Sequence, residues 1–111
     1  MSYTTDPDDP RLGHGTDVEP QDQHGVYLIL SEEERKKGFV RPLYRAYIHH
    51  DPGCGVVTTM GLVLCETYAR SPAFYGATYC CGCRMHRPVG KHGEFTWLDE
   101  RGRDTHVLVG T

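Results

Sequence analysis

Residues 80–86 decide the fold, and they read Cys80-Cys81-Gly82-Cys83-Arg84-Met85-His86. Two residues separate Cys80 from Cys83, and at this spacing two thiolates can chelate one tetrahedral ion from a single tight turn. Gly82 eases the turn because it has no Cβ. Redox dithiols use the same spacing but open a helix after a strand, and Pro88 leaves little room for a helix. We therefore predict a metal-binding turn.

A second turn, earlier in the chain, supplies the remaining ligands. It runs His49-His50-Asp51-Pro52-Gly53-Cys54-Gly55, a composition typical of turns. Twenty-five residues separate Cys54 from Cys80, which is within the range that zinc fingers and ribbons use between ligand pairs. His49, His50 and His86 are all candidates for the fourth position. We predict a closed site of three cysteines (54, 80 and 83) and one histidine, which suits Zn²⁺ in a structural role.

The two other cysteines are not expected to bind the ion. Cys65 lies on the apolar face of a predicted helix and is expected in the core. Cys81 points away from its neighbours within the turn. The odd total of five cysteines favours reduced thiols over a disulfide framework.

The elements predicted around these turns are short. Residues 26–30, 39–49 and 56–59 are rich in β-favouring side chains, and Pro42 predicts an edge position for the middle segment. Residues 94–98 and 106–109 flank a polar turn and predict a closing β-hairpin.

Two helices complete the expected fold. Ser31 and Glu34 form a capping-box signature that begins a helix of about two turns, ending at Gly38. The longer helix is predicted over residues 60–70, with Leu62, Cys65 and Ala69 on one apolar face. The fold class expected is therefore α+β: a small zinc-ribbon-like domain with two short helices and short antiparallel strands.

Charge divides the chain at residue 25. Residues 1–25 hold six acids against one arginine, and are poor in apolar side chains. We predict an acidic flexible arm there, followed by a zinc-binding domain over residues 26–111. That domain holds nine acids and eleven Lys or Arg residues. The chain's 111 residues contain no apolar stretch near the roughly 18 residues of a membrane span, so we expect no membrane partner.

Binding is a better expectation than catalysis. The sequence has no zinc-deaminase, H-E-x-x-H, G-x-S-x-G or Walker A pattern. Arg84, Arg87 and Lys91 follow the cysteine turn in a region that also holds several aromatic residues. Such a combination can contact phosphates and stack on bases, although the net charge of −3 argues against a protein that simply coats nucleic acid.

Several segments resemble a group of small uncharacterised proteins of bacteriophages and prophages. They are Glu33-Glu34-Arg35, Gly38-Phe39-Val40-Arg41-Pro42, Cys54-Gly55-Val56-Val57-Thr58-Thr59-Met60, Glu66-Thr67-Tyr68-Ala69-Arg70, Phe74-Tyr75-Gly76, Cys80-x-x-Cys83-x-x-His86-x-Pro88-Val89 and Glu94-Phe95-x-Trp97. In that group a Tyr-x-His precedes the Cys-Gly step, which implies His49 as the fourth ligand. This chain departs from the pattern by extra residues before Cys54.

The resemblance implies a phage origin and a zinc site, but no activity. It makes the host cytoplasm or the virion the expected location, and the lack of a signal-peptide pattern argues against secretion. The first expected function is a nucleic-acid- or host-protein-binding module. The second is a structural part of a phage particle, in which residues 1–25 pack on other phage proteins. A metal-dependent enzyme is the third.

Overall fold

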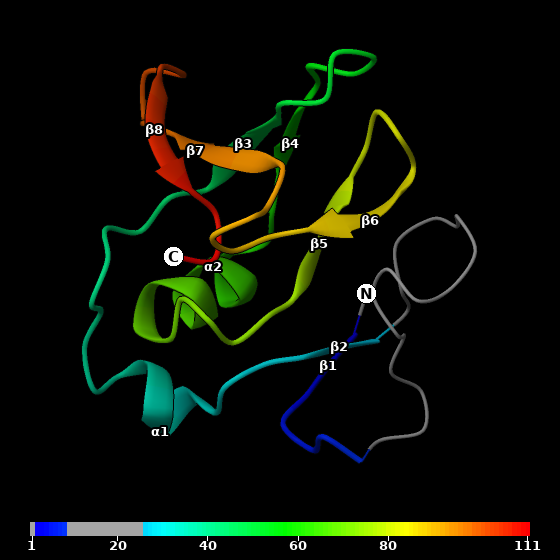
Figure 1. Ribbon diagram of the computed structural model, residues 1–111. Coiled ribbons are helices and arrows are strands. Elements are labelled where there is room, and N and C mark those ends of the chain that lie inside the picture. Colours follow the sequence, from blue (N-terminus) through cyan, green and yellow to red (C-terminus); the bar gives the residue numbers. More distant parts are fainter. Residues whose placement is uncertain (1, 9–25) are drawn as a thin grey trace.

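The computed structural model describes residues 2–8 and 26–111, and in this part the chain folds as α+β (Figure 1). The main sheet has four antiparallel strands in the order β4-β3-β7-β8. They span Val57–Thr59 (β4), Ala46–His49 (β3), Phe95–Leu98 (β7) and Asp104–Leu108 (β8). The predicted α+β class with short antiparallel strands is confirmed.

Two smaller sheets flank this one. Strands β5 (Ala77–Cys80) and β6 (Met85–Pro88) form an antiparallel hairpin around the cysteine turn. Strand β1 (Ser2–Thr4) pairs in parallel with β2 (Val26–Leu28). The predicted arm therefore contributes a strand to the fold through residues 2–4, whereas residues 9–25 lie outside the described residues.

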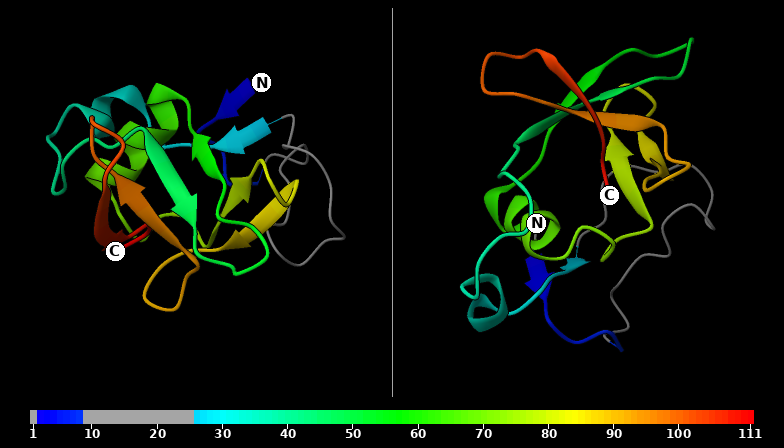
Figure 2. Two further views of the ribbon diagram at one scale, coloured as in Figure 1. Left: turned by 90° about the horizontal axis from the view of Figure 1, so that it is seen from above. Right: turned by 60° about the vertical axis from the view of Figure 1, so that its left-hand side comes forward.

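Helices α1 (Glu32–Arg35) and α2 (Leu62–Arg70) lie with the β1–β2 pair at the end of the molecule opposite the tips of the main sheet (Figure 2). Arg35 of α1 pairs with Glu66 of α2 at 3.2 Å, which joins the two helices. Neither of these two helices has the length and apolar character of a membrane span.

The core lies between the main sheet and α2 and is largely aromatic. Tyr47 of β3 meets Phe95 and Trp97 of β7 edge-on, with ring centroids 5.2 and 5.9 Å apart. Tyr68 of α2 packs edge-on against Trp97 at 5.5 Å. Cys65 is 1% exposed in the same cluster, as predicted. Edge-to-face contacts of this kind add to the hydrophobic gain of burying the rings.

Three details of the predicted elements are wrong. Strand β3 is an interior strand rather than an edge, because Pro42 lies before it in an irregular segment and removes no ladder hydrogen bond. Leu62 is 46% exposed because α2 begins there, and its buried face starts at Cys65. Helix α1 is a single turn rather than two.

The start of α1 follows half of the capping box. The amide of Glu34 donates to Ser31 Oγ at 3.2 Å. The Glu34 carboxylate instead pairs with Lys37 at 2.9 Å and with Arg70 of α2 at 3.4 Å. The Glu34 carboxylate therefore forms ion pairs instead of the hydrogen bond to the Ser31 amide that a complete capping box would contain.

Candidate metal centre

The first ligand turn connects β3 to β4 and holds His49 and Cys54. Asp51 organises it: its Oδ1 accepts from the Gly53 amide at 2.8 Å, and its carbonyl accepts from the Cys54 amide at 2.9 Å. Gly55 follows with a φ of 69°, in the left-handed region that favours glycine. The turn thus presents Cys54 beside the end of β3, where His49 lies.

The second ligand turn connects β5 to β6 and holds Cys80 and Cys83. The Arg84 amide donates to the Cys80 carbonyl at 2.7 Å, and the Cys83 amide donates to Cys80 Sγ at 3.4 Å. An amide hydrogen directed at a cysteine sulfur stabilises the thiolate form. This turn therefore has the local geometry that a chelating cysteine pair needs.

Gly82 allows the two turns to meet. A Cβ at this position would lie 2.6 Å from Val56 Cγ2 and 3.0 Å from Cys54 Sγ, both in the other turn. The predicted reason for Gly82 was turn formation, but the backbone φ of this glycine is not in the left-handed region. The structure shows that close approach between the turns is what requires a glycine here.

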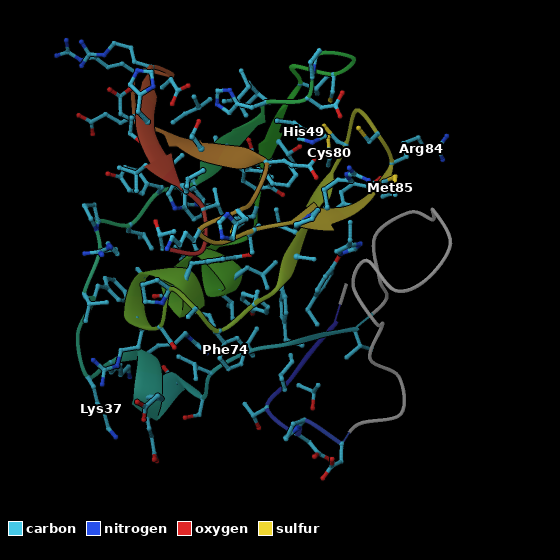
Figure 3. All side chains as sticks on the ribbon, viewed as in Figure 1. Lys37, His49, Phe74, Cys80, Arg84 and Met85 are labelled. Carbon is cyan, nitrogen blue, oxygen red and sulfur yellow. The ribbon has the colours of Figure 1, made fainter. Side chains whose placement is uncertain are left out.

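The four predicted side chains converge (Figure 3). One ligand atom each from His49, Cys54, Cys80 and Cys83 lies within 4.8 Å of all the others. The sulfurs of Cys54 and Cys80 are 3.5 Å apart, too far for a disulfide of about 2.05 Å. His49 Nδ1 lies 3.5 Å from Cys80 Sγ and 3.4 Å from Cys83 Sγ.

These distances fit the edges of a metal tetrahedron. With Zn–S bonds of about 2.3 Å and Zn–N bonds of about 2.05 Å, tetrahedral angles place ligand sulfurs ~3.8 Å apart and sulfur and nitrogen ~3.6 Å apart. The observed 3.4–3.5 Å is slightly tighter. The cluster can hold a metal ion, and the donor set is compatible with zinc.

The Glu94 carboxylate and the Arg87 guanidinium lie on the side of the His49 ring that carries Nε2, opposite the cysteine sulfurs. His49 is 1% exposed, and its Nε2 lies 2.8 Å from Glu94 Oε1. Arg87 in turn donates to both oxygens of Glu94 at 3.0–3.2 Å. Phe95 stacks on the imidazole at 4.6 Å. A carboxylate that accepts the Nε2 proton leaves the Nδ1 lone pair for a metal, the usual arrangement behind a metal-binding histidine.

Crowding of the thiols favours a cation at their centre. Burial, followed by the neighbouring Cys54 and Cys80, raises the pKa of Cys83 to about 12. Burial also raises the pKa of Cys80. The Val56 amide, by contrast, lowers the pKa of Cys54 to about 7. Burial and the neighbouring sulfurs therefore disfavour three thiolates together, and the charge of a divalent metal ion would offset this.

The alternative histidines are engaged elsewhere. His50 Nε2 lies 2.6 Å from Thr96 Oγ1 and 3.2 Å from Asp104 Oδ2. His86 Nε2 lies 3.1 Å from the hydroxyl of Tyr27. The geometry thus selects His49. The exposed Cys81 also lies outside the cluster, and its sulfur contacts the Val57 carbonyl and the Thr58 hydroxyl.

The three predicted nucleic-acid contacts fall in different surroundings. Arg84 is exposed at the tip of the β5–β6 turn and points away from the domain (Figure 3). Lys91 is exposed in the connection between β6 and β7. Arg87 belongs instead to the support behind His49. The roles of Arg87 and Glu94 beside His49 were not predicted, because no local sequence motif marks either residue.

Comparisons with known proteins found no match, whether to a family model, to a curated protein or to a solved structure. The resemblance to phage and prophage proteins therefore stays a prediction that rests on the quoted motifs. The chemistry of the site follows from its own side chains. Three thiols and one imidazole offer four ligand atoms, the number that a tetrahedral zinc site uses.

Proposed function

We propose that this chain is a small zinc-binding protein of the zinc-ribbon type, in which the ion is structural and the folded domain is a binding module. One observation carries the proposal: four protein ligand atoms from two turns lie within 4.8 Å of one another. Catalytic zinc sites keep one coordination position for water or substrate, whereas this donor set fills four. Zinc is preferred over other divalent ions because thiolates and imidazole in a tetrahedral arrangement suit it.

The energetic contribution expected from the ion is large for this fold. Structural zinc contributes an apparent ~10–16 kcal/mol in zinc-finger peptides, while whole domains are stable by about 5–15 kcal/mol. In this chain the ion would join the β3–β4 turn to the β5–β6 hairpin, which belong to separate sheets. Without it, three crowded thiols would hold the two turns together poorly.

Cobalt substitution and elemental analysis test this proposal directly. We expect one zinc per purified chain, and a Co²⁺ form with the intense visible absorption of a tetrahedral thiolate site. Chelation should lower Tm sharply. A Co²⁺ spectrum typical of six oxygen ligands, or an unchanged Tm after complete zinc removal, would overturn the structural role.

For the partner of the module we propose nucleic acid. The acidic excess of the chain resides in residues 1–25, so residues 26–111 carry two more Lys and Arg residues than acids. Arg84, one residue after Cys83, and Lys91, in the connection between β6 and β7, are both exposed and can contact phosphates. Phosphate contacts release counterions, so binding should weaken as salt rises.

The double variant Arg84→Gln with Lys91→Gln tests this partner. Each lost phosphate contact should reduce the slope of log K against log salt by about one, so the pair should reduce it by about two. The matched control is Lys36→Gln with Lys37→Gln, which removes the same charge from the end of α1, far from the metal centre (Figure 3). Retention of an oligonucleotide with equal salt dependence by both variants would exclude this surface, and absence of retention by the parent chain would favour a host protein as partner.

The role in a phage particle stays a prediction. Strand β1 pairs with β2 of its own chain, so residues 2–4 already have a partner. Nothing in residues 2–8 favours a neighbouring subunit over this internal pairing.

A further inference from the structure

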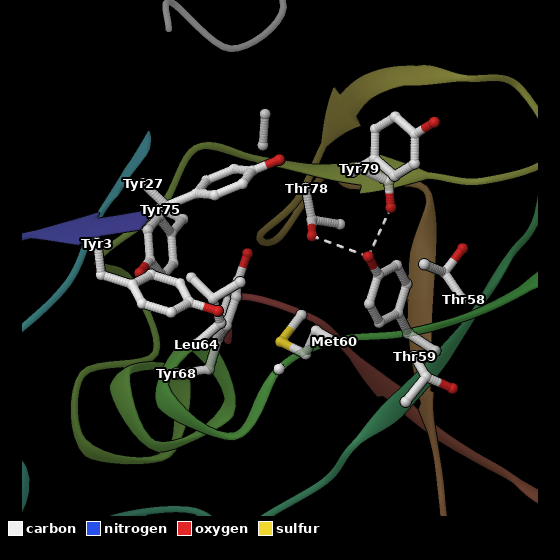
Figure 4. A pocket seen from close by; sticks show the side chains of 13 residues that line it. Tyr3, Tyr27, Thr58, Thr59, Met60, Leu64, Tyr68, Tyr75, Thr78 and Tyr79 are labelled. Atoms are coloured by element: carbon white, nitrogen blue, oxygen red, sulfur yellow. Dashed lines mark hydrogen bonds between the residues drawn. The ribbon is translucent and has the colours of Figure 1, made fainter. Parts of the chain in front are cut away.

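A pocket of about 270 Å³ lies apart from the four candidate metal ligands, none of which lines it. Strands β1 and β2 and the residues before β5 form one side of it, β5 forms another, and the start of α2 forms its floor (Figure 4). Six of the chain's seven tyrosines line this pocket, and the seventh, Tyr44, does not. The six are Tyr3, Tyr27, Tyr47, Tyr68, Tyr75 and Tyr79.

Most of the interior hydroxyls of these tyrosines have partners within the protein. Tyr47 donates to the Tyr79 carbonyl at 2.5 Å, and Tyr75 donates to the Leu28 carbonyl at 2.5 Å. Tyr27 lies 3.1 Å from His86 Nε2. Such pairing is what buried polar groups require, and it fixes the rings in place.

Tyr68 is the exception. It is 5% exposed, and its hydroxyl is buried without a hydrogen-bond partner in the described part of the chain. Thr78 interacts with Tyr68, but its hydroxyl lies outside hydrogen-bond geometry for the Tyr68 hydroxyl and donates to Tyr47 at 3.2 Å. A buried hydroxyl left unpaired costs stability. Its position in the wall of a pocket indicates that a ligand atom completes the pair.

The lining limits the chemistry of that ligand. Among the described residues, no charged side chain lines the pocket, and Met60 and Leu64 supply apolar surface beside the aromatic rings. The part of a ligand that enters is therefore uncharged, flat enough to lie against aromatic rings, and polar at one edge. A volume of about 270 Å³ is just below the usual ~300–1,000 Å³ of ligand pockets, so it admits one ring system rather than a chain of them.

We infer that this pocket binds a single unstacked nucleobase, with the Tyr68 hydroxyl hydrogen-bonded to a polar edge atom of the base. Bases stack on tyrosine irrespective of sequence, and their edges carry both donors and acceptors. A quaternary ammonium group also binds aromatic cages, but it cannot hydrogen-bond to Tyr68. The inference deepens the proposed nucleic-acid function: the base comes either from a free nucleoside or from a single strand.

Calorimetry on the full zinc-loaded chain tests the inference. The probes are adenosine, cytidine, a short single-stranded DNA, the same sequence as a duplex, and choline. We expect saturable binding of a nucleoside or of the single strand, and none of choline. Binding of free nucleosides alone identifies a nucleoside site, and tighter binding of the single strand identifies a strand-bound base.

The Tyr68→Phe variant distinguishes a ligand contact from a structural role. It should weaken nucleobase binding about tenfold while raising Tm, because it removes a buried hydroxyl that lacks a partner. The matched control is Tyr44→Phe, which changes the one tyrosine outside the pocket and should leave affinity unchanged. A lower Tm for Tyr68→Phe, or equal affinities for the two variants, would overturn the inference.

Two further outcomes separate this inference from the proposed function. If the single strand binds through Arg84 and Lys91 but Tyr68→Phe binds it equally well, the nucleic-acid function stands and the pocket inference fails. If nucleosides bind in a Tyr68-dependent way while no oligonucleotide is retained, the pocket is confirmed and the nucleic-acid function fails. Binding of choline alone would overturn the nucleobase assignment.

Discussion

Replacing Glu94 with glutamine should weaken metal binding without removing a metal ligand. The Glu94 carboxylate lies 2.8 Å from His49 Nε2, and Nδ1 of the same ring faces the sulfurs of Cys80 and Cys83 at 3.5 and 3.4 Å. Glutamine keeps the shape of the side chain but loses the charge that holds the Nε2 proton and pairs with Arg87. Loss of such a supporting carboxylate typically costs 10–100-fold in metal affinity, or about 1.4–2.7 kcal/mol.

Competition with a chromophoric chelator at neutral pH measures this effect as a change in the Kd for Zn²⁺. We expect Kd to rise by about 10–100-fold for Glu94→Gln. The matched control is Glu66→Gln, which breaks another carboxylate–arginine pair, with Arg35 at 3.2 Å, between the helices. Equal Kd values for the parent and Glu94→Gln would refute the inference that Glu94 supports the metal ligand, as would an equal rise in both variants.

Three other expectations concern the metal turns and the core. Cys83→Ser should unfold the domain or lower its Tm greatly, whereas Cys81→Ser should leave Tm unchanged because that sulfur lies outside the cluster; a stable, zinc-free Cys83→Ser would contradict the structural site. Zinc binding at about pH 7.5 should release about two to three protons, because the pKa of Cys83 is raised to about 12, that of Cys80 is also raised and that of Cys54 is lowered to about 7. The apparent affinity for Zn²⁺ should therefore increase with pH. Calorimetry in buffers of different ionisation enthalpy measures the proton release, and a result of no release would argue against thiolate ligands. Tyr47→Phe should cost about 1–3 kcal/mol in a denaturant unfolding experiment, because it leaves the Tyr79 carbonyl without its hydroxyl donor; an unchanged free energy of unfolding would show that this bond contributes nothing.

The sequence predicted that the three cysteines converge because the geometry of each turn is mostly local, whereas the choice of His49 among three histidines came from the resemblance. The spacing of Cys80 and Cys83 fixes one turn, and Asp51 with Gly53 fixes the other through hydrogen bonds over two or three residues. What brings the two turns together is not local. The space that Gly82 leaves for Val56 exists only in the folded chain, so the sequence suggested a different reason for that glycine.

Strand positions were harder to predict for the same reason. Residues 39–49 predict one extended segment broken by Pro42, but only Ala46–His49 has neighbours on both sides to complete a ladder. Pro42 therefore carried no information about the edge of the sheet, because it precedes the strand. The pattern shows that a strand exists, while its ends depend on partners far along the chain.

The pocket was missed because it depends on an unexpected strand. The acidic composition of residues 1–25 predicted a flexible arm. It gave no indication that Ser2–Thr4 would pair with Val26–Leu28 as a strand. Tyr3 reaches the pocket only through that pairing. The six tyrosines also lie at separate positions in the sequence, so no sequence motif predicts that they line one cavity.

The metal centre and the pocket share strand β5. Cys80, at the end of this strand, is one of the four side chains that could hold an ion, while Ala77, Thr78 and Tyr79, immediately before it, line the pocket. Tyr47 ties the same segment to the main sheet through its bond to the Tyr79 carbonyl. An ion bound at Cys80 would therefore fix one wall of the pocket without touching what binds there. A closed metal site can raise affinity in this way because it orders the surface that contacts the ligand before the ligand arrives. The loss of conformational entropy then occurs on folding rather than on binding.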